Sequence, residues 1–130
     1  MPVYAPAWQY GGPVLSVSRL CEALAAKGIA IEVITTNAGL SEFPASELGR
    51  PITRNGVPVT YYPVDRPTGP IRSRKLEEAL SDVMGRADLL HISAIWQPLG
   101  IPIQREAIRQ GVPILHTLRG AVGPYSLSQR

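Results

Sequence analysis

Apolar residues recur every three or four positions in three stretches of the chain, which is the spacing of an amphipathic helix. The first stretch predicts a helix over residues 13–27, with Gly28 as its C-terminal stop. The second begins after Ser73, whose hydroxyl can cap a helix. The third ends at Gly111, with Pro102 near its start. The pattern therefore predicts three helices that each bury one face.

Between these helices lie short runs that are continuously apolar or rich in β-branched residues, as in buried strands. The runs cover residues 29–35, 57–64, 88–93 and 113–118. Pro58 and Pro63 favour an edge position for the second run, because proline cannot donate to a strand ladder. Asn55-Gly56 marks a turn before it, and residues 37–54 are predicted to form a long loop.

The alternation of strands with helices predicts an α/β fold, a parallel sheet with helices on both faces. A sheet of this kind should begin with a strand before the first helix, yet only Pro2-Val3-Tyr4 precedes the first glycine-containing loop. The chain also stops a few residues after a turn. We therefore expect residues 1–130 to be one domain of a larger protein, incomplete at both ends.

Composition narrows the class of protein and of partner. A hydrophobic content of 45% and a charged content of 18% in 130 residues are typical of one globular domain. The net charge of +3 comes from scattered basic residues, so a nucleic-acid partner is not expected. Only Arg72, Arg74 and Lys75 form a cluster. This cluster is either ordinary solvated surface or a site of weak attachment to anionic lipid.

Cysteine content and hydropathy indicate the compartment. The single cysteine, Cys21, falls in the apolar stripe of the first helix and is expected to be a buried, reduced thiol. No apolar run reaches the ~20 residues of a membrane span, and the N-terminus lacks the pattern of a signal peptide. We expect a cytoplasmic protein, with peripheral contact at the inner face of the membrane as an option.

The segment Trp8-Gln9-Tyr10-Gly11-Gly12-Pro13 directly precedes the first predicted helix. Two glycines allow the backbone to pass close to a bound group, and proline suits the first helical turn. The unpaired N–H groups at a helix start attract anions such as phosphate. A tight turn between a strand and a helix explains the same residues, and both interpretations stay open here.

Ligands of open α/β sheets bind outside the carboxyl ends of the strands, where two further loops are expected at residues 93–98 and 119–124. Arg119 precedes Gly120 at such an end, so its guanidinium is suited to bind a phosphate or a carboxylate. The alternative is that Arg119 forms an ordinary surface ion pair. Trp96 either stacks on a sugar face or anchors its loop. His91 either contacts a ligand or is a partly buried structural histidine.

Several common chemistries find no support in the sequence. There is no dinucleotide-binding glycine motif, no P-loop and no nucleophile elbow. His91 and His116 lack metal-ligand spacing to a partner, and no pair of carboxylates is placed for acid–base work. The chain therefore offers binding groups, with catalytic residues unknown and no metal expected.

Taken in order, three segments resemble the N-terminal domain of family 4 glycosyltransferases, which have the two-domain, Rossmann-like GT-B fold. The first runs from Tyr4 through Gly11-Gly12 to Thr36, and the second, from His91 to Gln97, is similar to a His-x-His-x-x-Trp segment. The third, from Gly111 to Leu127, is similar to a Pro-His-Gly turn with Arg119-Gly120 in the place of His-Gly. The resemblance spans nearly the whole chain.

The resemblance implies that this domain mainly holds the acceptor, while a C-terminal domain, absent here, holds most of a nucleotide-sugar donor such as a UDP- or GDP-sugar. It implies sugar transfer with retention to a saccharide or lipid-linked acceptor, as in polysaccharide biosynthesis, without a metal or other cofactor. Gly11 and Gly12 would approach the donor diphosphate or the acceptor, with Tyr10 beside them. Arg119 would face the donor sugar, with Gly120 keeping the turn tight.

Two departures and two alternatives accompany this interpretation. Ser93 replaces the second histidine of the family segment, and the paired glutamates of the family belong to the absent domain. The isolated chain is therefore expected to be inactive. The alternatives are a non-catalytic nucleotide- or sugar-binding module, or a GT-B enzyme of other chemistry, such as an epimerase or a phosphorylase.

Overall fold

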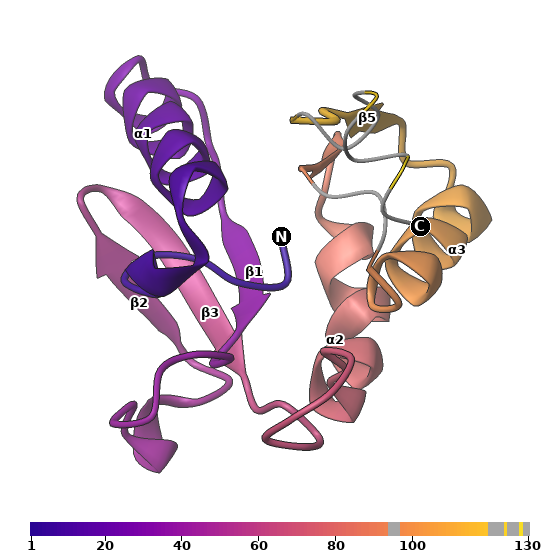
Figure 1. Cartoon of the computed structure of the whole chain (residues 1–130). Helices are drawn as coiled ribbons and strands as arrows, with labels where there is room; N and C mark the ends of the chain where they lie inside the picture. The colour runs from indigo at the N-terminus through magenta and orange to yellow at the C-terminus, as the bar shows by residue number, and fades with distance from the viewer. Residues whose placement is uncertain (94–96, 120–123, 125–127, 129–130) are drawn as a thin grey trace.

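The computed structural model describes residues 1–93, 97–119, 124 and 128 (Figure 1). Its helices are α1 (Gly12–Ala26), α2 (Arg74–Gly85) and α3 (Gly100–Gln110), and short 3-10 turns occur at η1 (Trp8–Tyr10) and η2 (Ala45–Glu47). Its strands are β1 (Val33–Thr36), β2 (Pro51–Arg54), β3 (Val57–Tyr62), β4 (Leu90–Ile92) and β5 (Ile114–His116). The expected α/β class and each expected helix are confirmed.

Local signals set the helix boundaries. The Ser73 hydroxyl accepts a 3.2 Å hydrogen bond from the Leu76 N–H and so caps α2, as predicted. Gly111 adopts a left-handed φ of 71° at the end of α3, and Gly28, just beyond α1, has a φ of 82°. A side chain would strain the backbone at these positions, which explains why both helices end there.

The strands form two groups. In the first, β1 and β3 are parallel, while β2 and β3 form an antiparallel hairpin. In the second, β4 and β5 are parallel. The three-stranded sheet is therefore mixed, where a parallel sheet is expected from the sequence, and β2 lies within residues 37–54, which are predicted to form a loop. The Asn55-Gly56 turn is confirmed, since both residues have the positive φ of a tight hairpin.

The position of β3 overturns one prediction. Pro58 and Pro63 of the run over residues 57–64 suggest an edge strand, but β3 is the middle strand of its sheet, between β1 and β2. Pro58 is exposed and lies before Val59, the first residue that pairs with β1, while Pro63 lies beyond the strand. Neither missing N–H therefore interrupts the parallel ladder, and this location removes the penalty that the prediction assumed.

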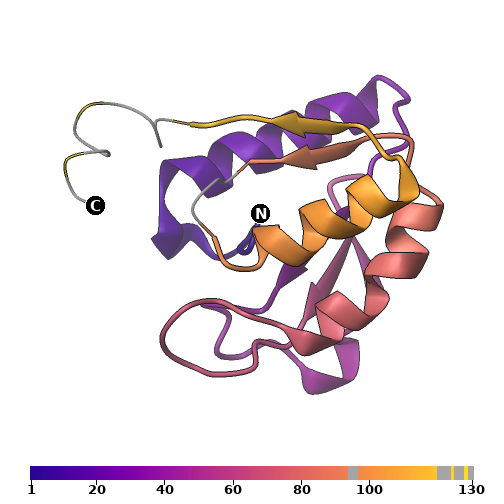
Figure 2. The ribbon, with the colours of Figure 1, turned by 90° about the vertical axis from the view of Figure 1, so that its right-hand side faces the viewer.

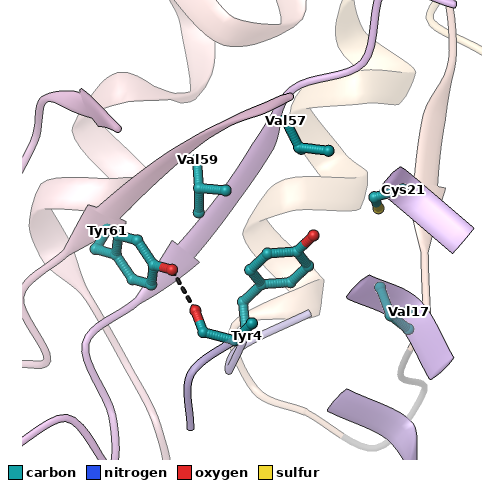
Figure 3. Packing of buried hydrophobic residues seen from close by; sticks show 7 residues of the cluster. Tyr4, Val17, Cys21, Val57, Val59 and Tyr61 are labelled. Carbon is teal, nitrogen blue, oxygen red and sulfur yellow. Dashed lines mark hydrogen bonds between the residues drawn. The ribbon is translucent and has the colours of Figure 1, made fainter. Parts of the chain in front are cut away.

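Helices cover both faces of the β1–β3 sheet, as expected. Alternate residues of β3 point to one side, where Val57, Val59 and Tyr61 pack against α1 residues Val17 and Cys21 (Figure 3). The next residue, Tyr62, packs with Ile34 against the core that α2 and α3 build around Leu76 and Met84. The two-residue period of β3 thus separates the two cores.

The segment before η1 is an integral part of the first core. Tyr4 is almost fully buried beside Val57 and Cys21, and the Tyr61 hydroxyl donates a hydrogen bond to the Ala5 carbonyl (Figure 3). Cys21 is a buried, free thiol, as predicted, and burial raises its pKa. These contacts hold the start of the chain under α1 and so fix where the loop before α1 begins.

Candidate functional site

The start of α1 is built by two glycines with different roles. Gly11 occupies the N-cap position with a φ of 81°, a conformation that favours glycine, and no side chain caps the helix there. A side chain at Gly12 would meet no atom within 4 Å, so packing within this structure does not explain that glycine. The first N–H groups of α1 lack intrahelical acceptors, and the helix start is exposed. This end of α1 is therefore open to an anion.

The turn η1 is held against the loop that follows β1. The Gln9 side-chain amide donates a 2.5 Å hydrogen bond to the Gly39 carbonyl, and any side chain on Gly39 would collide with Gln9 and Tyr10. Tyr10 therefore lies beyond the carboxyl end of β1, with 44% of its surface exposed. An exposed aromatic ring at this edge of the sheet can contact the apolar face of a ligand.

The strand β5 (Figure 2) ends at His116 near the far end of the chain. Arg119 follows it after two residues and has a left-handed φ of 39°. Its guanidinium Nη1 donates a 2.8 Å hydrogen bond to the Ser16 hydroxyl on α1. The structure thereby joins the carboxyl end of β5 to the first turns of α1. The two groups that the sequence indicated separately, the Gly11-Gly12 start and Arg119, belong to one surface.

A chain of hydrogen bonds lies next to this surface at the ends of β4 and β5. The His91 Nε2 is 3.0 Å from the Thr117 hydroxyl, which in turn donates to the Ser93 hydroxyl at 3.2 Å. Burial lowers the pKa of His91, and electrostatic interactions with Arg119, the N-terminal amino group and His116 lower it further. His91 is therefore a neutral imidazole at neutral pH, fixed in place by Thr117.

The comparison with protein families decides what this surface belongs to. The family model of the glycosyl transferase 4-like domain matches residues 11–130 of the chain. The chain belongs to this family. No curated protein and no solved structure gives a significant match. The expected resemblance and the Rossmann-like fold class are thus confirmed, and the chain is a glycosyltransferase domain.

The electrostatics of this glycosyltransferase domain favour an anion at the α1 start. Arg119 contributes a full positive charge, and the N-terminal end of α1 contributes the positive end of its dipole. Within the described residues, the ion pairs join other side chains, and the hydrogen-bond partner of Arg119 is the neutral Ser16. This speaks against the alternative that Arg119 serves in an ordinary surface ion pair.

The described residues include most, but not all, of the predicted site. Tyr10, Gly11, Gly12, His91 and Arg119 are placed as stated above, and their roles in binding stay predictions. Trp96 and Gly120 lie outside the described residues.

Sequence reasoning missed Ser16 and Thr117, the residues that hold Arg119 and His91. Ser16 was merely one of several polar residues off the apolar face of α1. Thr117 had a weak signal, because it lies near the carboxyl end of the strand predicted over residues 113–118. Neither signal was specific, since both roles depend on contacts between segments far apart in the sequence.

One hollow of the structure does not belong to this surface. A hollow of about 290 Å³ is lined by residues of η1, α1 and the β2–β3 turn, among them Trp8, Glu22 and Arg54, but not by Gly11, Gly12 or Arg119. No group of three or more potential metal-ligating side chains occurs in the described residues. No helix among the described residues is both long and apolar enough to span a membrane.

Proposed function

We propose that this domain forms the acceptor-side wall of the substrate cleft in a retaining hexosyltransferase that uses a UDP- or GDP-sugar. The observation that carries the proposal is the Arg119–Ser16 hydrogen bond, because it brings a fixed cation to the open start of α1. A helix start and an arginine at one surface are suited to the two negative charges of a diphosphate.

Each residue of the surface has a role in this proposal. The backbone at Gly11 and Gly12 lets a phosphate approach the free N–H groups of α1, since Gly12 faces open space. Arg119 neutralises charge on the diphosphate as the sugar leaves. The exposed ring of Tyr10 supports a sugar of the donor or the acceptor. The neutral imidazole of His91 can donate a hydrogen bond to a sugar hydroxyl or accept one from it.

The proposal also covers the rest of the parent enzyme. A second domain would carry most of the donor site and the catalytic residues, and closure of the two domains would exclude water and align the substrates. Half of such a cleft provides neither effect. We therefore expect no sugar transfer by residues 1–130 alone, and transfer detected above a buffer blank with a UDP- or GDP-sugar and a saccharide acceptor would contradict this.

The location proposed for the enzyme is the cytoplasm, with an acceptor that is a saccharide or is linked to a lipid. Arg72, Arg74 and Lys75 are exposed, but Lys75 is paired with Glu78 at 3.2 Å, so attraction to anionic lipid would be weak. Co-sedimentation with phosphatidylglycerol vesicles at low and physiological salt tests this attraction.

A titration tests directly whether the start of α1 and Arg119 bind an anion. The chain is titrated with UDP, GDP, UDP-glucose and GDP-mannose while the melting temperature is followed, and the Arg119→Gln variant is titrated in parallel. We expect at least one nucleotide to raise the melting temperature of the wild-type chain and to have a smaller effect on the variant. Arg72→Gln, an exposed arginine outside the surface, serves as the matched control. No change with any of the four compounds would contradict the proposed site.

A further inference from the structure

The hollow of about 290 Å³ lies between η1, the second half of α1 and the turn that joins β2 to β3. Its lining combines Tyr4 of the first core with the exposed Trp8 and the polar side chains of Glu22, Arg54 and Asn55. Its size is near the lower end of small-ligand sites, which range from about 300 to 1,000 Å³. The hollow is therefore large enough for one unit of a longer ligand.

This hollow is separate from the surface that carries Arg119. Glu22 comes ten residues after Gly12, so it lies about 15 Å farther along the axis of α1. It also faces a different side of the helix from Ser16, the partner of Arg119, because the two residues are about 120° apart around the axis. The Asn55-Gly56 turn precedes β3 and lies at the amino end of the β1–β3 ladder, whereas the proposed diphosphate site lies at the carboxyl ends. Figure 1 shows α1 and the β2–β3 hairpin in one half of the molecule and β5 in the other.

The Glu22 carboxylate is held in place from two sides. The Arg19 guanidinium donates to its Oε2 at 3.3 Å, and the Asn55 side-chain amide donates to its Oε1 at 3.0 Å. The second bond spans 33 positions of sequence and ties the β2–β3 turn to α1. The Glu22 side chain is still 21% exposed, and each carboxylate oxygen has a further lone pair. Glu22 can therefore accept a hydrogen bond from a ligand without changing its position.

Arg54 brings hydrogen-bond donors to the same hollow. The carbon of its guanidinium lies 5.5 Å from the centre of the Tyr61 ring, a cation–π contact that orients the planar group. Its Nε is buried without a hydrogen-bond partner, and none of the ion pairs among the described residues includes Arg54. An arginine has five N–H donors. The guanidinium therefore retains donors for a ligand that carries hydroxyl groups.

Trp8 supplies an apolar surface beside these polar groups. It is 52% exposed, whereas tryptophan is highly buried on average. The face of an indole suits the C–H face of a sugar ring. Glu22 and Arg54 carry opposite charges, so together they favour a ligand that is polar but uncharged. A neutral sugar has both features that this lining requires, an apolar face and a rim of hydroxyl groups.

We infer that this hollow binds one pyranose unit of a neutral oligosaccharide, with the ring stacked on Trp8 and its hydroxyl groups bonded to Glu22 and Arg54. The hollow is a second point of attachment for a glycan, apart from the surface at Gly11 and Gly12. The inference requires neither a nucleotide nor the transfer reaction, so it goes beyond the proposed function.

An NMR titration of the 130-residue chain tests this site. Cellotetraose, maltotetraose and mannotetraose are added in turn, at millimolar concentration, to the isotope-labelled chain. We expect at least one of them to shift the resonances of the Trp8 indole N–H and of the Asn55 side-chain amide. If none of the three shifts either resonance, the inference is overturned.

Substitutions identify the stacking surface. Trp8→Ala should weaken saccharide binding at least about tenfold, because the aromatic face is lost. Leu15→Ala, at another exposed apolar residue near η1, is the matched control and should leave the affinity unchanged. If Tyr10→Ala weakened binding as much as Trp8→Ala or more, the saccharide would bind at the start of α1, and the inference would be wrong.

A second variant keeps the test valid if Trp8→Ala folds poorly. Glu22→Gln preserves the size of the side chain and removes its charge, and we expect it to weaken saccharide binding about threefold or more. Circular dichroism checks the fold of each variant. Wild-type affinity in a folded Glu22→Gln variant would overturn the role of Glu22 and with it the inference.

Titration with UDP and GDP separates this inference from the proposed function. Trp8→Ala should retain the nucleotide binding of the wild-type chain, because Trp8 lies outside the surface formed by the α1 start and Arg119. A wild-type chain that binds a saccharide in the hollow but no nucleotide would contradict the proposed function alone. A chain that binds a nucleotide but no saccharide would contradict this inference alone.

Discussion

The Arg119 guanidinium donates a hydrogen bond to the Ser16 hydroxyl across 103 positions of sequence. This contact joins the carboxyl end of β5 to the first turns of α1, so that a cation and a helix start lie on one surface. Arginine retains its charge at any physiological pH. The contact thus preserves a positive charge at the site.

Substitutions of Arg119 and Ser16 separate two contributions to nucleotide binding, the positive charge of Arg119 and the position in which Ser16 holds it. Arg119→Gln removes the cation, and we expect it to weaken UDP or GDP binding at least about tenfold, since hydrogen bonds to charged groups contribute about 1.5–3 kcal/mol. Ser16→Ala keeps the cation and removes only its anchor, so a smaller loss is expected. Isothermal titration calorimetry at fixed salt measures both. A Ser16→Ala loss as large as that of Arg119→Gln would show that positioning, and not charge, dominates.

The two glycines before α1 are expected to respond differently to alanine. Gly11→Ala forces a side chain into a backbone conformation of φ 81° and ψ −154°, which is essentially confined to glycine, and should cost about 1–3 kcal/mol of unfolding free energy. Gly12→Ala meets open space, so stability should change little while nucleotide affinity falls, because the methyl group lies where a phosphate would approach. Urea unfolding and nucleotide titration of both variants measure this. If Gly12→Ala bound the nucleotide with wild-type affinity, this would argue against anion binding at the start of α1.

Stability should depend on pH through His91. Its pKa in the folded chain lies below the ordinary value of 6.5, so the unfolded chain binds a proton more readily than the folded chain between these two values. The unfolding free energy should therefore fall as the pH drops below about 6.5 and level off below the folded pKa. Urea unfolding between pH 8 and 5 measures the slope, which His91→Gln should reduce. An unchanged slope in that variant would assign the effect to another group.

The cap of α2 offers a test of a local prediction. Ser73→Ala removes the hydroxyl that accepts from the Leu76 N–H and leaves that buried donor without its partner. We expect a loss of about 1 kcal/mol in unfolding free energy. Ser81→Ala, an exposed position within the same helix, is the control and should change stability by less than about 0.5 kcal/mol. Equal effects of the two substitutions would show that the cap contributes nothing.

The sequence by itself determined the features that depend on near neighbours. The apolar spacing of α1, the hydroxyl of Ser73 and the glycines at positions 28 and 111 act within one or two helical turns, so the helices and their ends were predictable. The Asn55-Gly56 turn is similarly local. The candidate binding groups at the start of α1 and at Arg119 could also be proposed from the sequence, because both stand next to predicted elements, and their roles in binding stay predictions.

Only the tertiary structure decided what depends on contacts between distant segments. It placed β3 in the middle of its sheet and added β2 as a hairpin partner, because strand order follows from hydrogen bonds between strands and not from the residues of one strand. It also joined Arg119 to Ser16 and His91 to Thr117. The physical reason is common to these cases: each contact gains its energy from a partner far along the chain, whose position no local pattern encodes.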